Sequence, residues 1–191
     1  MIEQEALKRA DACFLAVLGK VGVNQWQDPS PNPGWNVAYL ARHIMEGIVW
    51  VPHVLSGATI EAAGDKFSGD LLGKNPKAAA EQACAEAEAA VGGMSDLDTT
   101  VHLSYGDFTA RTYLHHQIID ITIHTWDLAR GVGADETLDP ALVAAVYDWF
   151  IPEAASWRDA GLLQLPVPVP ADADTQTRLL ALSGRQAVLA D

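Results

Sequence analysis

One stretch of the 191-residue sequence decides the fold, and it reads LHHQIIDITIHTWDL at residues 114–128. At about 100° per residue on a helix, its polar side chains fall in one narrow arc. They are His116, Asp120, His124 and Asp127. Apolar residues lie on both sides of this arc. The opposite face of the helix, with His115, Thr122 and Ala129, is the one most expected to face solvent. The polar arc is therefore predicted to point inward, into a helical core.

An inward carboxylate and imidazole need partners, because burying either group unpaired is costly. Asp120 and His124 stand one helical turn apart and can hold a single ion together. A further ligand must come from another helix, and the best donor is His43, within WNVAYLARHIMEG at residues 35–47. Gly47, one turn beyond His43, removes a side chain and is expected to leave room for water or substrate.

Each of these candidates also has an ordinary structural interpretation. Taken alone, Asp120 and His124 are more typical of a hydrogen-bonded pair within a helix than of a metal site. A lone His43 is typical of a core histidine whose hydrogen bonds are satisfied. The six tryptophans are assigned to the core by default.

Three neighbouring polar residues keep two interpretations each. His116 is either a fourth ligand or a group that supports one, and we favour the supporting or purely structural role. Asp127 either orients a ligand or forms an ion pair with Arg130. Glu46 is either a general base or, as we prefer, a solvated residue at the rim.

Composition limits the partners. The chain has 12 basic and 25 acidic side chains, hence a net charge of −13, which argues against nucleic acid and anionic membrane surfaces. Its apolar fraction of 49% excludes a disordered chain. Cys13 and Cys84 lack CxxC spacing, so no disulfide framework or thiolate zinc site is expected. Without a membrane-spanning run or secretory leader, the predicted location is the cytoplasm, and the surface permits a homodimer.

Helical periodicity, together with the Gly and Pro residues that start or end helices, predicts a mainly α protein with a small β-hairpin. Helices are expected at residues 3–19, 36–56, 76–91, 110–130, 139–159 and 175–182. Gly131 is expected to stop the fourth helix, and Pro152 to interrupt the fifth. The hairpin covers residues 101–109, with its turn at Gly106 and Asp107.

Two segments also resemble a known family. SPNPGWNVAYLARH at residues 30–43 and DITIHTWDLAR at residues 120–130 are similar to the two motifs of the metal-binding N-terminal domain of mycothiol-dependent maleylpyruvate isomerase, in the DinB-like superfamily. Short single-domain relatives are more similar still. For them the similarity continues into LDP at residues 138–140, VPVP at residues 167–170 and RLLALSGR at residues 178–185.

The resemblance implies a DinB-like four-helix bundle with a long crossover between the second and third helices. It further implies one domain over residues 1–191, with the bundle at 1–135 and a C-terminal extension at 136–191 packed on it. The implied ligands of a divalent ion, usually zinc, are His43, Asp120 and His124.

Two departures from the isomerase limit what carries over. The isomerase has Glu where this chain has Asp120, which is one methylene shorter, so the ion is expected to sit differently or to be another, such as Ni²⁺. The isomerase also has a separate C-terminal domain that supplies a catalytic arginine, and this chain is expected to lack or replace it. Metal binding therefore carries over, whereas maleylpyruvate isomerisation does not.

Two functional hypotheses follow from the resemblance. The first is a metal-dependent transferase or isomerase that uses a low-molecular-weight thiol such as mycothiol on an electrophilic small molecule. The alternative is a non-catalytic bundle that binds a metal or another ligand. A di-iron carboxylate bundle is a weaker interpretation, because it needs more Glu and Glu-x-x-His repeats than this chain contains.

Overall fold

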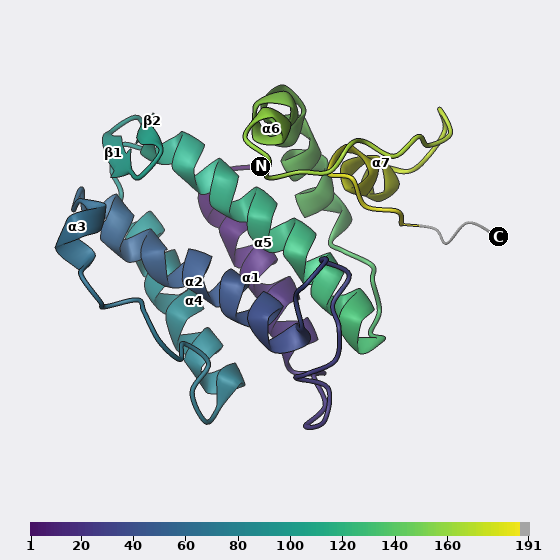
Figure 1. Ribbon diagram of the computed structural model, residues 1–191. Coiled ribbons are helices and arrows are strands. Elements are labelled where there is room, and N and C mark those ends of the chain that lie inside the picture. The colour runs from purple at the N-terminus through teal and green to yellow at the C-terminus, as the bar shows by residue number, and fades with distance from the viewer. Residues whose placement is uncertain (188–191) are drawn as a thin grey trace. The chain divides into compact units, whose positions relative to one another are not determined.

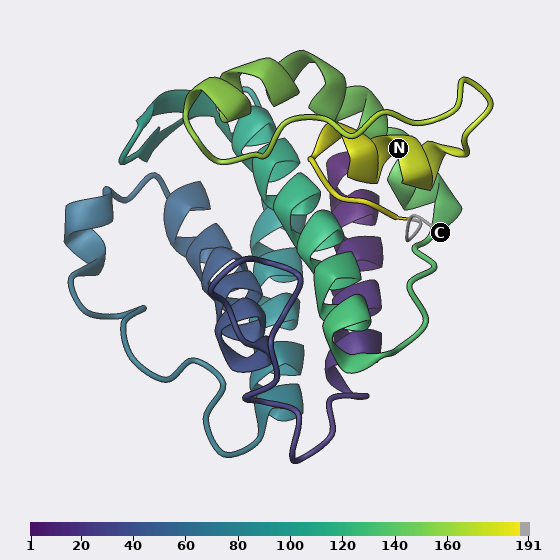
Figure 2. The ribbon, with the colours of Figure 1, turned by 45° about the vertical axis from the view of Figure 1, so that its right-hand side comes forward.

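Four long helices form the body that holds the polar arc. They are α1 (Glu3–Leu18), α2 (Val37–Leu55), α4 (Pro76–Gly92) and α5 (Ala110–Val132). Helix α1 packs beside α4 and α5, and α2 packs beside the same two helices, so the four close into a ring (Figure 2). This arrangement confirms the predicted mainly α, DinB-like four-helix bundle.

The computed structural model describes residues 1–187, and the chain divides into two compact units (Figure 1). The first unit spans Ile2–Thr137 and contains the bundle, and the second begins at Leu138. The prediction that the C-terminal extension packs on the bundle stays a prediction. None of the helices in the described residues combines the length and apolar character needed to cross a bilayer.

Side-chain caps explain where the bundle helices begin. The Asn36 side chain accepts a hydrogen bond from the Tyr39 N–H, which caps α2 as the sequence predicts. Asn75 caps α4 in the same way, with Pro76 in the first turn where a missing N–H costs nothing. The long connection from α2 to α4 holds only the short helix α3 (Ile60–Ala63) among its described elements.

Helix α5 differs from the prediction at its end and on its outer side. It continues through Gly131 to Val132 and stops at Gly133, whose φ of 68° is the left-handed conformation that favours glycine. Thr122 and Ala129, expected to face solvent, are each only 1% exposed. The Thr122 hydroxyl donates to the Ile118 carbonyl, which satisfies it without water.

The hairpin forms as predicted, but its turn lies elsewhere. Strand β1 (Thr100–Leu103) pairs antiparallel with β2 (Gly106–Thr109). Leu103 pairs with Gly106, so the turn falls on the two residues between them rather than on Gly106 and Asp107. Thr109 then caps α5, which starts directly after the hairpin.

The second unit contains α6 (Pro140–Asp159) and α7 (Thr175–Leu182). Helix α6 runs on through Pro152, so the predicted interruption is wrong. A proline removes only one helix hydrogen bond, and the buried Phe150 and Ala154 on either side favour continuation. The proline-rich segment before α7 forms neither helix nor strand.

Candidate metal centre

The structure brings together three residues that the sequence analysis selected. Helix α2 supplies His43, and α5 supplies Asp120 and His124; one donor atom from each lies within 4.8 Å of the others. Asp120 faces one imidazole with each oxygen. Its Oδ2 lies 3.2 Å from His43 Nε2, and its Oδ1 lies 3.4 Å from His124 Nε2. Among the described residues, this is the group of His, Cys, Asp and Glu side chains that converges closely enough to hold an ion.

The three side chains sit at the edge of the bundle core. The exposed fractions are 35% for His43, 28% for Asp120 and 11% for His124. None points into bulk solvent, and none is sealed from it. A small molecule can therefore approach from the side of His43 and Asp120.

The electrostatic surroundings of His43 favour the protonated form of its imidazole. Burial alone lowers the pKa of His43, but its hydrogen bond to Asp120 and the negative charges of Asp120 and Glu46 outweigh burial and raise it. Glu46 itself accepts a hydrogen bond from the Arg42 guanidinium at 2.9 Å and is partly exposed. That placement agrees with a rim residue rather than a general base.

Trp35 is a site residue that the sequence analysis left in the core. Its ring stacks on His124 at a centroid distance of 5.6 Å and an interplanar angle of 27°, and it lies 5.0 Å from the His43 ring. The indole thus covers one side of both imidazoles. Its place immediately before the α2 cap, eight residues or about two turns from His43, was the signal available in the sequence.

Asp127 contacts His124, as expected of a residue that orients a ligand. Its Oδ2 lies 2.8 Å from His124 Nδ1, and the residue is 1% exposed. Arg130 pairs with Glu136 through two hydrogen bonds of 2.9 and 2.8 Å, and stacks over Trp126.

His116 does not join the three converging residues. It is buried, and its ring meets Phe108 edge-on at 5.6 Å. This supports the structural role that we favoured for His116. Its neighbour His115 lies 3.2 Å from Glu3 on α1.

Gly47 does not open the space expected beside His43. A Cβ built at Gly47 would lie 2.7 Å from Gln117 Oε1. The glycine therefore makes room for the Gln117 amide of α5, and the expectation of a gap for water or substrate is wrong at this position.

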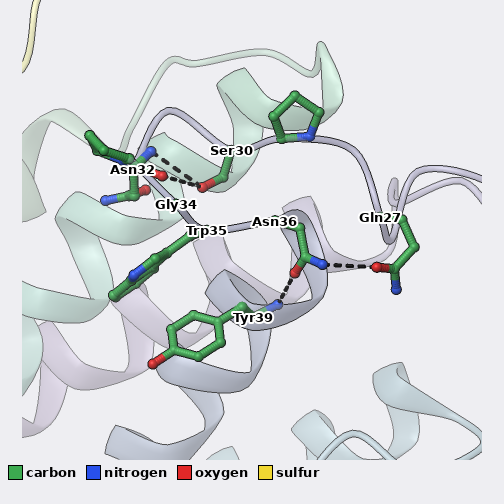
Figure 3. Close-up of a pocket in the computed structure, with 9 residues that line it drawn as sticks. Gln27, Ser30, Asn32, Gly34, Trp35, Asn36 and Tyr39 are labelled. Carbon is green, nitrogen blue, oxygen red and sulfur yellow. Dashed lines mark hydrogen bonds between the residues drawn. The ribbon is translucent and has the colours of Figure 1, made fainter.

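The loop before α2 carries a shallow open groove next to Trp35 (Figure 3). Its walls include Ser30, Asn32 and Tyr39, and Asn36 bridges to Gln27 on its far side. The loop is held closed by an isolated β-bridge between Pro29 and Asn36.

The donor set fits a divalent ion. In a tetrahedral zinc site with bonds of about 2.0–2.1 Å, neighbouring ligand atoms lie about 3.3 Å apart. Each Asp120 oxygen lies near that distance from one imidazole nitrogen, at 3.2 Å for His43 and 3.4 Å for His124, and the three donor atoms as a set lie within 4.8 Å of one another. The shorter Asp in place of Glu therefore still reaches both imidazoles. Two imidazoles and a carboxylate form a borderline donor set that suits zinc and related divalent ions.

Comparisons with known proteins agree with this geometry. Residues 7–129 match the family model of the mycothiol maleylpyruvate isomerase N-terminal domain. Two Mycobacterium tuberculosis proteins, uncharacterized protein MT0763 of strain CDC 1551 / Oshkosh and uncharacterized protein Rv0738 of a second strain, are each 31% identical to it over 137 residues. Those residues are 72% of this chain and 71% of each relative. No solved structure matches significantly. The matched segment covers α2, α5 and all three converging residues, and the chain belongs to the mycothiol maleylpyruvate isomerase N-terminal domain family.

Proposed function

We propose that this protein binds a divalent ion, zinc in the first instance, through His43, Asp120 and His124. We further propose that it uses the ion to activate a mycothiol-type thiol for transfer to, or isomerisation of, an electrophilic small molecule in the cytoplasm. The observation that carries the proposal is the convergence of two imidazoles and a carboxylate within 4.8 Å.

Three protein ligands are the number found at catalytic zinc sites, where one position stays open for water or substrate. The partial exposure of His43 and Asp120 supports an open side that faces solvent. A structural site, by contrast, uses four protein ligands and is closed. The donor count therefore supports a site that exchanges ligands.

The chemistry proposed is that of a thiolate. Bound here, the ion would lower the pKa of a coordinated thiol and so supply a nucleophile at neutral pH. The protein's own residues supply the surroundings. Trp35 shields one face of both imidazoles from water, and Asp127 fixes the orientation of the His124 ring.

The substrate class follows from what a thiolate attacks. The sulfur forms a C–S bond with one carbon of an activated double bond, the π electrons move to the neighbouring carbon, and that carbon takes up the proton lost by the thiol. The product is a thioether, and this is transfer. If the addition reverses after rotation about the new single bond, the result is isomerisation. The net charge of −13 disfavours nucleic acid and anionic membranes as partners.

Metal analysis tests the first half of the proposal. We expect freshly purified protein to hold about one divalent ion per chain, and His124→Ala to lose it, because that change leaves two ligands. His102→Ala is the matched control, since His102 pairs with Asp107 on the hairpin and is not one of the three converging residues. Absence of a stoichiometric ion in wild type, or its retention by His124→Ala, would contradict the proposal.

Thiol conjugation tests the second half. Zinc-loaded protein is incubated with mycothiol and an activated alkene, and the thioether is measured by mass spectrometry against His124→Ala. We expect conjugation above the uncatalysed rate with wild type only. If chelation lowers the melting temperature while no conjugation or isomerisation is detected, the non-catalytic alternative holds instead.

A further inference from the structure

The loop before α2 reaches a buried carboxylate, Asp127, beside the three converging residues. Asp127 is almost fully buried at 1% exposure, so its charge needs strong hydrogen bonds. One comes from within α5, where its Oδ2 lies 2.8 Å from His124 Nδ1. The second comes from a distant part of the chain, since the Asn32 Nδ2 donates to the same oxygen at 3.1 Å.

The loop holds Asn32 in place through its own hydrogen bonds. The Asn32 N–H donates to the Ser30 hydroxyl at 3.2 Å, and that hydroxyl contacts the Asn32 carbonyl (Figure 3). The Trp35 N–H donates to the Asn32 carbonyl at 3.0 Å, and the Ser30 N–H donates to the Trp35 carbonyl at 2.9 Å. The amide that reaches Asp127 is therefore preorganised by the same turn that positions Trp35 over His124.

Asp127 Oδ2 contacts both the Asn32 amide and His124 Nδ1, and this geometry orients the His124 ring. An ionised carboxylate only accepts hydrogen bonds, so the imidazole contributes Nδ1–H and the amide contributes its NH₂ group. With the proton on Nδ1, the Nε2 lone pair of His124 faces Asp120, 3.4 Å away. Nε2 is then the nitrogen available to an ion.

We propose that Asn32 is a positioning residue of the metal centre, which acts through Asp127 to hold His124 in the tautomer that presents Nε2. The inference rests on the proposed metal site. It adds to that site a residue outside α2 and α5 that affects how one ligand is oriented. The loop containing Asn32 thereby sets the orientation and basicity of a ligand that lies 92 positions further along the chain.

The test replaces Asn32 by Ser, which is too short to donate to Asp127. Asn36→Ser is the matched control, because it removes an amide donor to Gln27 from the same loop while a serine still caps α2. Zinc affinity is measured by competition with a chromophoric chelator, and the ligand field by the visible spectrum of the Co²⁺ form. We expect Asn32→Ser to weaken zinc binding about 10- to 100-fold and to alter the Co²⁺ spectrum. Asn36→Ser is expected to stay within about threefold of wild type.

A second readout does not require an ion. The ¹⁵N shifts of the His124 ring in metal-free protein report which nitrogen carries the proton. We expect a protonated Nδ1 in wild type and in Asn36→Ser, and a mixed population in Asn32→Ser. If zinc fails to bind wild type, the proposed function fails, and these shifts still decide the role of Asn32.

Equal zinc affinity and equal ring shifts in Asn32→Ser and wild type would overturn the inference. So would equal losses in both Ser variants, since that result indicates a general disturbance of the loop. If Asn32→Ser does not fold, Asn32→Ala removes the same donor and is judged by the same measurements.

Discussion

Asp11 on α1 is a carboxylic acid placed where water does not reach. It is 1% exposed and faces Cys84 and Glu88 of α4. Burial, and then the negative charge of Glu88, raise the pKa of Asp11 to about 8, against a lowering by the neighbouring Cys84 thiol. Burial likewise raises the pKa of the Cys84 thiol, so that thiol stays protonated and unreactive. At neutral pH the α1–α4 contact therefore contains a neutral acid.

This residue makes the stability of the fold depend on pH. The unfolded carboxyl releases its proton near its ordinary pKa of 3.8, whereas the folded one keeps it up to about 8. The free energy of unfolding should therefore fall as pH rises between these values, by at most about 1.4 kcal/mol per pH unit. Asp11→Asn cannot ionise, and we expect it to be more stable than wild type at pH 8 and nearly equal at pH 4.

Urea denaturation at both pH values measures the effect. The control is Glu86→Gln, which removes an exposed carboxylate from α4 and should follow the wild-type pH dependence. A stability difference between Asp11→Asn and wild type that is the same at pH 4 and pH 8 would show that Asp11 is not the titrating group.

At the scale of helices and strands, some sequence signals predict where an element begins or ends and others do not. Helix starts are well predicted, because Asn36 and the Asn75–Pro76 pair carry specific caps. The end of α5 is not well predicted, because Gly131 and Gly133 are the same residue type and either could end the helix. Only the backbone distinguishes them, since Gly133 adopts a positive φ and Gly131 does not.

The two glycines should respond oppositely to alanine. Gly133→Ala forces a side chain into the left-handed conformation and should destabilise the fold by about 1 kcal/mol. Gly131→Ala places a Cβ in ordinary contact with Pro31 and Val37 at 3.6 Å and gains helix propensity, so we expect no loss or a small gain. Thermal melting of the pair checks this. A greater loss in Gly131→Ala would mean that the helix stops where the sequence suggested.

The candidate site was predictable in part for the same kind of reason. The spacing of Asp120 and His124 on one helix face fixes their proximity, whatever the rest of the fold does. The partner His43 required the pairing of α2 with α5. Only its place just before the α2 cap linked Trp35 to the site, and nothing in the sequence linked Asn32 to it, because the contacts of both depend on how an irregular loop folds back over α5.

For the whole molecule, the main long-range interaction is the electrostatic repulsion between its negative charges. A net charge of −13 on 191 residues produces self-repulsion in the folded state. Surface pairs such as Arg9 with Glu5 are attractive, but exposed pairs contribute little. Raising salt from about 10 to about 150 mM shortens the screening length from about 30 to about 8 Å, and we expect the melting temperature to rise by a few degrees.

Differential scanning calorimetry in sodium and in potassium chloride measures this effect, and both salts should act alike. A melting temperature that falls with salt would show that ion pairs outweigh the net repulsion. The same negative charge also attracts divalent cations non-specifically. Metal titrations should therefore be carried out at the higher ionic strength, where this attraction is screened.

The direct contact between His43 and Asp120 joins positions that are 77 apart in the chain. In the denatured chain, holding such distant positions together costs about 4 kcal/mol of loop-closure entropy. In the native chain the packing of α2 against α5 already holds them together. A cation shared by these residues would therefore behave as a removable cross-link that distinguishes the native chain from the denatured one. Chelators should then speed unfolding as well as block chemistry, and the amount of intact protein should follow the supply of metal.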